Sequence, residues 1–248
     1  MALAGVVVLA GLFAAGRAAA LSQAADDAIR PVHEALRHER DAQAGAGPAR
    51  DLAERLVRLG ALDQAGRALL HTIDLSRLPE GERVPASEAM WREIGAQDSE
   101  DQAALVALLP PQGWFTSDRV GADAASAAWS VVQHATGNLG LMQSVLERMT
   151  PAVAAGQVAA DDYAKLLDRV AMLKGEPQTY GTQFKCVDHA WRRYAMLDPE
   201  HVEERRRALG MTETAAAEAA VIAAYPPCWF GRQRTATRAR GRPSGRRS

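Results

Sequence analysis

Long runs of alanine, leucine, arginine and glutamate, broken at proline and glycine, constrain the fold of this chain most. Aromatic residues account for only 5% of its 248 residues. This composition is typical of packed helices and predicts a mainly α fold rather than a β-sandwich or a barrel. The length allows a single domain of ordinary size with extensions. With helices of typical length, we expect about six to eight of them.

The first 20 residues predict an export signal. An uncharged apolar run covers residues 2–16 and is short for a bilayer span. Ala18 and Ala20 follow in the A-x-A arrangement that is typical of a signal-peptide cleavage site. A positively charged region before the apolar run is missing, so the amino group of Met1 or an upstream start would have to supply that charge. We favour a secretory signal peptide over a membrane anchor and leave residues 1–20 out of the fold.

The opposite end of the chain is strongly basic. Residues 231–248 hold seven of the 29 Lys and Arg residues and no acidic residue, so the rest of the chain has 22 basic and 30 acidic residues. With few apolar side chains, this Arg-rich tail is expected to be disordered. It could contact nucleic acid, anionic lipid or the acidic body, while a solvated tail without specific function is the simpler interpretation. The acidic body lacks the basic surface that nucleic-acid binding needs.

Two cysteines, Cys186 and Cys228, are the only ones in the chain. In an oxidising compartment such a pair can close a disulfide, and two unpaired thiols are the alternative. If the signal peptide is real, we favour the disulfide. A metal site is not predicted, because no C-x-x-C is present and the histidines of HEALRH, His33 and His38, lie about 140° apart on a helix. No cofactor fingerprint is present either.

Proline, glycine and capping residues predict where the helices begin and end. Residues 21–48 read as a helical segment with a break at Pro31 and a linker, followed by one helical domain at 49–230 and the tail at 231–248. Two short strands around the sequence VDH predict a β-hairpin near residues 178–196. The other expected boundaries are a helix at 49–71, a loop at 72–87, a capping box at Ser99–Gln102, a restart at Pro151 and a helix end at Gly175.

Asp63 interrupts the apolar stripe of the helix expected at 49–71. Leu56 and Leu59 mark that stripe, and a carboxylate on it is costly unless it is paired. Arg67 stands one turn later and can serve as its partner. The pair is either a structural ion pair at a helix interface or a site carboxylate held by an arginine, and the structural interpretation is the simpler one.

Several motifs together resemble a bacterial family of unknown function numbered 6624. The segments that carry the resemblance are GWFTSDRVGADAASAAWSVVQHA, DYAKLLDRVAMLKGEPQTYGTQF and EERRRALGM, and the resemblance covers roughly residues 50–225. The sequence differs from the family pattern at Phe115, Ser130 and Met142 and in the segment after His134. The resemblance implies a mostly helical single domain and locates a site, but it implies no activity. Within a bacterium, export would lead to the periplasm or the cell envelope.

The polar residues that match the family motifs form the candidate site. In an enzyme with hydrolase-type acid–base chemistry, His134 would be the general acid or base and Asp168 would orient it. Arg67 or Arg169 would hold an anion in that case. Possible ion pairs between the motifs are Asp63 with Arg169 and Asp168 with Arg67. The expected ligand-binding residues are Asp63, Gln64, Arg67, Trp129, Gln133, Arg169, Gln178, Tyr180, Thr182 and Gln183.

Three functions remain open at this point. The polar cluster could bind a small ligand or a protein partner without chemistry, it could be an enzyme site, or it could be a buried hydrogen-bond network that docks the hairpin on the helices. An activated nucleophile motif is absent, which weighs against the enzyme. We therefore expect an interaction or ligand-binding module. The sequence does not give the oligomeric state.

Overall fold

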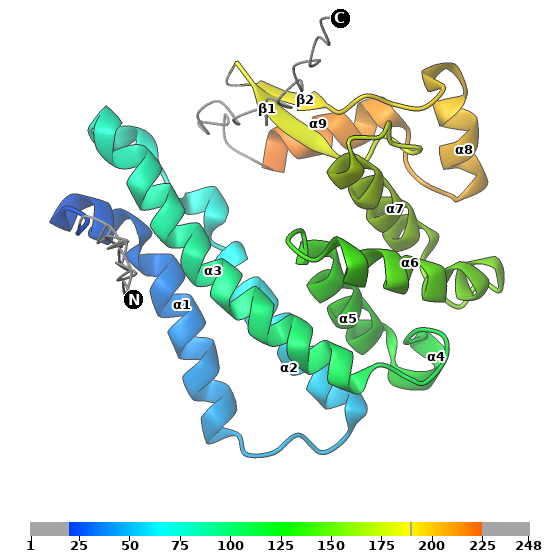
Figure 1. The fold of residues 1–248 in the computed structure, drawn as a ribbon, viewed down its shortest axis with the longest axis horizontal. Coiled ribbons are helices and arrows are strands. Elements are labelled where there is room, and N and C mark those ends of the chain that lie inside the picture. Colours follow the sequence, from blue (N-terminus) through cyan, green and yellow to red (C-terminus); the bar gives the residue numbers. More distant parts are fainter. Residues whose placement is uncertain (1–19, 189, 225–248) are drawn as a thin grey trace, which may run out of the picture.

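The computed structural model describes residues 20–188 and 190–224, and in these ranges the fold is mainly α with one β-hairpin (Figure 1). This confirms the predicted class, with nine α-helices in place of the six to eight expected. Residues 1–19, the tail at 231–248 and Cys228 lie outside the described ranges. The helices are α1 (Gln23–Gly45), α2 (Leu52–Arg67), α3 (Glu80–Leu108), α4 (Ser117–Val120), α5 (Ala122–His134), α6 (Leu139–Ala154), α7 (Ala160–Lys174), α8 (Val202–Ala208) and α9 (Thr214–Ala224), with short 3₁₀ helices η1 (Leu70–Thr72), η2 (Leu75–Arg77) and η3 (Pro199–His201).

The three N-terminal helices all pack against one another. Figure 1 shows α1 alongside α3, and α2 contacts both. Their apolar faces meet in a cluster that includes Ile29, Leu36 and Ile94, each at most 1% exposed. Helix α1 therefore packs into the fold, although the sequence placed residues 21–48 in a segment before the helical domain.

Two prolines that were expected to break or restart helices lie inside them. Helix α1 runs through Pro31, and α6 runs through Pro151. Both prolines are exposed, so neither ring pushes into the core. Because the buried faces of the two helices are continuous on either side of each proline, packing outweighs the loss of one backbone hydrogen bond.

Helix α3 is a single long helix, whereas the sequence indicated a loop at 72–87 and a new helix after Ser99. It begins at Glu80 and continues without a break to Leu108. Ser99 does not cap a helix, because its hydroxyl donates to the carbonyl oxygen of Gly95 within the same helix, at 2.9 Å. The side chain thus bonds to the preceding turn, which is the other common role of serine in a helix.

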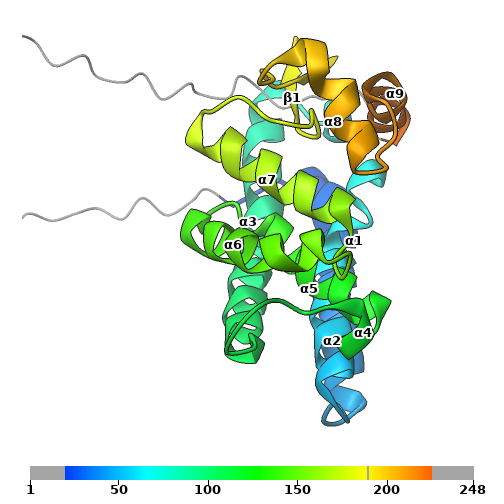
Figure 2. The same cartoon turned by 90° about the vertical axis from the view of Figure 1, so that its right-hand side faces the viewer.

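A second apolar cluster joins α2 to α5, α6 and α7. It contains Leu56 of α2, Val132 of α5, Met142 of α6 and Leu166 of α7, all 0% exposed. Helix α2 therefore belongs to both clusters. Figure 2 shows α7 lying between α8 on one side and α5 and α6 on the other. None of the helices in residues 20–188 and 190–224 is long and apolar enough to span a membrane.

The predicted hairpin is present but shorter than expected. Strands β1 (Phe184–Val187) and β2 (Ala190–Arg193) are antiparallel, and Phe184 pairs with Arg193. The expected strand from Gln178 to Cys186 is wrong in its first half, because residues 179–182 form a loop in which Gly181 has φ of 70°. This left-handed conformation suits glycine and is incompatible with a regular strand.

Candidate functional site

The predicted site residues form two clusters, each built around a buried aspartate. The first, the Asp63 cluster, joins α2 and α5 and contains Asp63, Gln64, Arg67, Ser130 and His134. The second, the Asp168 cluster, joins α7 to the loop before β1 and contains Asp168, Arg169, Gln178, Thr179, Tyr180, Thr182 and Gln183.

Four side chains donate hydrogen bonds to the carboxylate of Asp63, which is 2% exposed. Gln64 Nε2 and Ser130 Oγ reach Oδ2 at 2.7 and 2.9 Å. Arg67 Nη1 reaches Oδ1 at 3.1 Å, which confirms the predicted pairing within α2. Burial alone would raise the pKa of the Asp63 carboxyl, but the hydrogen bonds from His134 and Gln64, together with the charge of Arg67, outweigh it and hold the pKa below its usual value. Asp63 is therefore an ionised acceptor at neutral pH.

The fourth donor, His134, is fixed in orientation by Asp63. Its Nδ1 lies 2.9 Å from both carboxylate oxygens. Because an ionised carboxylate can only accept, Nδ1 carries a proton and donates it. The other ring nitrogen, Nε2, has no hydrogen-bond partner among the described residues, and the side chain is 25% exposed. The structure thus assigns to Asp63 the orienting role that was expected of Asp168.

Arg67 extends the Asp63 cluster to α3. Its Nη2 donates to Oδ2 of Asp98 at 2.7 Å, and the arginine side chain is only 12% exposed. One guanidinium therefore bridges two carboxylates and is not available as an anion-binding group of the kind expected from the sequence. Asp98 was not predicted, although the pair Asp98 and Asp101 lies at helical spacing on the buried face of α3.

Asp101 is a second unpredicted acid beside this cluster. It is 2% exposed, and its Oδ1 accepts from Gln97 Nε2 at 2.9 Å. Its Oδ2 has no hydrogen-bond partner in the part of the chain that the structure describes. Burial, reinforced by the charges of Asp63 and Asp98, raises the pKa of Asp101 to about 7. A continuous α3 would have been needed to predict its position, since the sequence placed it in a capping box.

Asp168 organises the loop that precedes the hairpin. It is 0% exposed and accepts from the backbone amides of Thr179, Tyr180 and Thr182 at 2.6, 3.0 and 2.9 Å. The hydroxyl of Thr182 adds a further bond of 2.9 Å. Among the described residues, no hydrogen bond joins Asp168 to His134, whose carboxylate partner is Asp63. Asp168 thus shapes the loop on which Tyr180 is carried.

The two glutamines of this segment fix its ends. Gln178 is 0% exposed, accepts from the amide of Gln183 at 2.8 Å and donates to the carbonyl oxygen of Tyr194 at 3.0 Å. Gln183 accepts from Arg169 Nε at 2.6 Å and donates to the carbonyl oxygen of Lys165. Both amides therefore hold backbone segments together. The Tyr180 ring is half-buried, and burial raises the pKa of its phenol.

Arg169 links the two clusters. Besides Gln183, it donates from Nη1 to the carbonyl oxygen of Gln133 at 2.9 Å, one residue before His134. Asp63 and Asp168 thus take partners other than the predicted cross-pairs with Arg169 and Arg67. Gln133 is buried, and its Oε1 has no partner within the described ranges. Trp129 docks α5 on α7 by donating from Nε1 to the carbonyl oxygen of Asp162 at 2.9 Å.

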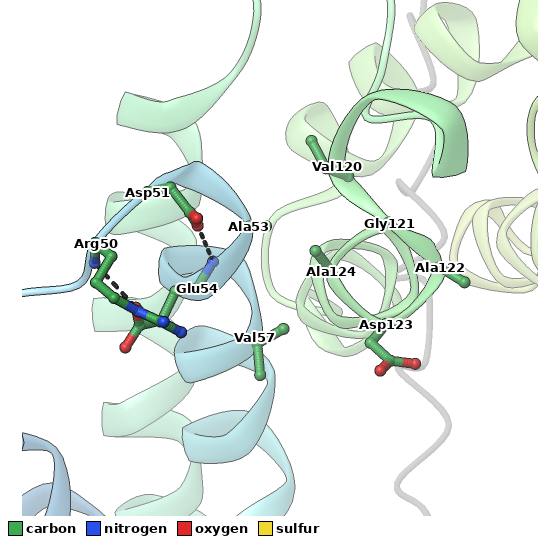
Figure 3. Close-up of a pocket in the computed structure, with 10 residues that line it drawn as sticks. All are labelled: Arg50, Asp51, Ala53, Glu54, Val57, Val120, Gly121, Ala122, Asp123 and Ala124. Carbon is green, nitrogen blue, oxygen red and sulfur yellow. Dashed lines mark hydrogen bonds and ion pairs between the residues drawn. The ribbon is translucent and has the colours of Figure 1, made fainter.

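The fold also has a cavity, which is lined by none of the predicted site residues. It has a volume of about 430 Å³ and lies between the N-terminal ends of α2 and α5 (Figure 3). In its lining, Arg50 pairs with Glu54 at 2.8 Å and the carboxylate of Asp51 caps the amide of Glu54. In the described residues, no group of three or more His, Cys, Asp and Glu side chains could hold a metal ion. Cys186 lies on β1, and its predicted bond to Cys228 stays a prediction.

Comparison with known proteins adds a family and no activity. Residues 50–221 match the model of a family of unknown function, DUF6624. The match covers α2 through most of α9 and includes every residue of the two clusters. No curated protein and no solved structure matches the chain.

Proposed function

The chain belongs to this family of unknown function, and we propose that its domain is a ligand-binding module in which Nε2 of His134 contacts the ligand. One observation carries the proposal: a buried, saturated carboxylate holds Nδ1 of a histidine whose other nitrogen has no partner among the described residues. Orienting one nitrogen through a carboxylate while the other stays accessible is a common arrangement for histidines that bind a ligand or transfer a proton.

The remaining members of the clusters hold Asp63 and the backbone beside His134 in place. Arg67 and Asp98 neutralise one another next to Asp63, so the carboxylate that faces His134 is held in place. The Asp168 cluster fixes the loop before the hairpin and, through Arg169, the backbone beside His134. We therefore assign ligand contact to the exposed edge of the Asp63 cluster and a supporting role to its interior.

Two substitutions at His134 separate binding from folding. In His134→Asn, the amide nitrogen can replace Nδ1 as a donor to Asp63, while Nε2 is lost. In His134→Gln, the amide can occupy the Nε2 position, while the bond to Asp63 is lost. We expect His134→Asn to keep the melting temperature and lose binding, and His134→Gln to lower the melting temperature because a buried acceptor loses a donor.

Binding is measured by screening a library of small cationic, neutral and anionic molecules against the protein. The readout is the NMR signals of the His134 ring in the wild type and the melting temperature of each variant. Compounds that shift the ring signals and stabilise the wild type, but not His134→Asn, support the proposal. The proposal is contradicted if every compound that raises the melting temperature of the wild type raises that of His134→Asn by the same amount.

A second candidate is an enzyme that uses His134 as a general base. The Asp63–His134 pair favours it, because a carboxylate on Nδ1 leaves Nε2 as the proton acceptor in the neutral imidazole. Relative to the sequence-based hypothesis, Asp63 replaces Asp168 as the positioning residue. Hydrolysis of a panel of ester and amide substrates that is abolished in His134→Asn and unaffected in Gln157→Ala would establish this function over simple binding.

Export to the periplasm or the cell envelope belongs to the same proposal. It is supported by the apolar run at residues 2–16 and the A-x-A arrangement of Ala18 and Ala20. The mass of the protein isolated from the envelope fraction tests it. Cleavage near Ala20 is the expected result, and an intact N-terminus in the cytoplasmic fraction would contradict it.

A further inference from the structure

The orientation of Gln64 determines which of its atoms is available at the site. Its Nε2 donates to Oδ2 of Asp63 at 2.7 Å and to the hydroxyl oxygen of Ser130 at 2.9 Å. Because Asp63 can only accept, the nitrogen must be the amide atom that faces it. Both amide hydrogens are then used. The carbonyl oxygen Oε1 of Gln64 remains available to accept a hydrogen bond from a ligand, and Gln64 is exposed.

His134 offers a second acceptor next to this one. With the proton on Nδ1 directed at Asp63, the neutral imidazole has a lone pair on Nε2. The imidazole and the Gln64 amide bind the same carboxylate, so both lie against Asp63 on the surface where α2 and α5 meet. The accessible edge of the cluster therefore presents two acceptors and calls for a ligand with donors.

The charges of the cluster also favour a positive ligand. The hydrogen bonds join two carboxylates, Asp63 and Asp98, to one guanidinium, that of Arg67. Asp101 lies close enough to Asp63 and Asp98 for their negative charges to raise its own pKa. In addition, α5 ends at His134, so the negative end of its dipole lies at the site. Arg169, the cation contributed by α7, is held by Gln183 and by the carbonyl oxygen of Gln133.

We propose that the ligand is a small organic amine whose ammonium group donates to Nε2 of His134 and Oε1 of Gln64. An ammonium group has several donors and no acceptor, which matches a site that presents acceptors beside a net negative charge. The inference rests on the proposed function, because it names the class of ligand for the same site.

Matched probes with and without an amino group test the inference. Glucosamine and 2-aminoethanol are titrated into the full chain near neutral pH, in comparison with glucose, ethylene glycol and acetate, while the His134 ring signals are followed by NMR. We expect glucosamine to shift these signals at concentrations about tenfold below those of glucose, since one charge-assisted hydrogen bond is worth about one decade or more of affinity. The Gln64→Ala variant should bind glucosamine about tenfold more weakly.

Gln157→Ala is the control, because Gln157 is an exposed glutamine in the connection between α6 and α7. It should bind glucosamine as the wild type does. If glucose or acetate shifts the His134 signals as strongly as the amines, the amine inference fails while ligand binding at His134 stands. If none of the five probes shifts them, the amine inference fails as well, and the library screen decides the binding proposal separately.

Discussion

At the scale of single residues, two buried aspartates have different roles because their donors differ. Asp63 receives side chains from α2 and α5, one of which is a titratable imidazole. Asp168 receives backbone amides from a loop. The i,i+4 pairing of Asp63 with Arg67 could be predicted, because it depends only on helical spacing. The partner of His134 could not, because it depends on how α2 packs against α5.

The role of Asp168 predicts a structural effect of substitution. Asp168→Asn replaces one acceptor oxygen with a donor that faces backbone amides, so we expect a loss of roughly 2–4 kcal/mol in the free energy of unfolding. Hydrogen exchange at Thr179, Tyr180 and Thr182 should become fast even where the rest of the fold stays protected. Asp118→Asn, at an exposed position, is the control. Unchanged protection of the three amides would show that the carboxylate does not hold the loop.

At the scale of helices, glycine sets the distance between α2 and α5. A Cβ added at Gly60 would lie 2.5 Å from the Cβ and 3.0 Å from the Cα of Ala127. The two backbones therefore approach as closely as a glycine–alanine contact allows, which brings Asp63 and His134 within hydrogen-bond distance. Gly60 lies in the helix expected at 49–71, but its contact with Ala127 depends on how α2 packs against α5 and cannot be predicted from the sequence.

Gly60→Ala should force the two helices apart and cost about 1–3 kcal/mol of the free energy of unfolding, as overpacking does in a dense core. Gly95→Ala, where an added Cβ meets nothing within 4 Å on α3, is the matched control and should stabilise slightly. Chemical denaturation of both variants is the measurement. Because the shortest contact is with the Cβ of Ala127, the double variant Gly60→Ala with Ala127→Gly should recover part of the loss, and no recovery would contradict direct contact.

The lengths of the helices were harder to predict than their existence. Gly175 ends α7 in the left-handed conformation, with φ of 74°, as its position after Lys174 indicated. Pro31, Pro151 and the capping box at Ser99 were misleading, because each local signal was overruled by a buried face that continues past it. Local rules thus located the helices, and packing decided where they end.

At the scale of the whole molecule, α2 connects the two apolar clusters, and a set of buried acids lies beside it. Global unfolding exposes these acids together, so the free energy of unfolding depends on their ionisation and therefore on pH. The composition was sufficient to predict the mainly α class. The polar interior was only partly predictable, because Asp98 and Asp101 become neighbours of Asp63 through contacts between α2 and α3.

Asp101 should make the protein less stable as the pH rises. Its pKa is about 7 in the folded protein and near 3.8 in the unfolded chain, so between these values the folded state binds more protons and stability falls with increasing pH. Asp101→Asn mimics the protonated form. Between about pH 5 and 8, the wild type should lose on the order of 2 kcal/mol relative to this variant. Urea titrations at several pH values measure the difference, with exposed Asp41→Asn as control. Parallel pH profiles for wild type and Asp101→Asn would exclude this role.

The central claim is that Asp63 fixes the proton of His134 on Nδ1 and leaves Nε2 as the acceptor that meets the ligand. Long-range ¹H–¹⁵N correlation NMR of the histidine rings tests it directly, above the pH at which the imidazole is doubly protonated. The account predicts that the His134 ring has a protonated Nδ1 and an unprotonated Nε2. A His134 ring with the proton on Nε2 would mean that Asp63 does not orient it, and the proposed site would then lose its basis.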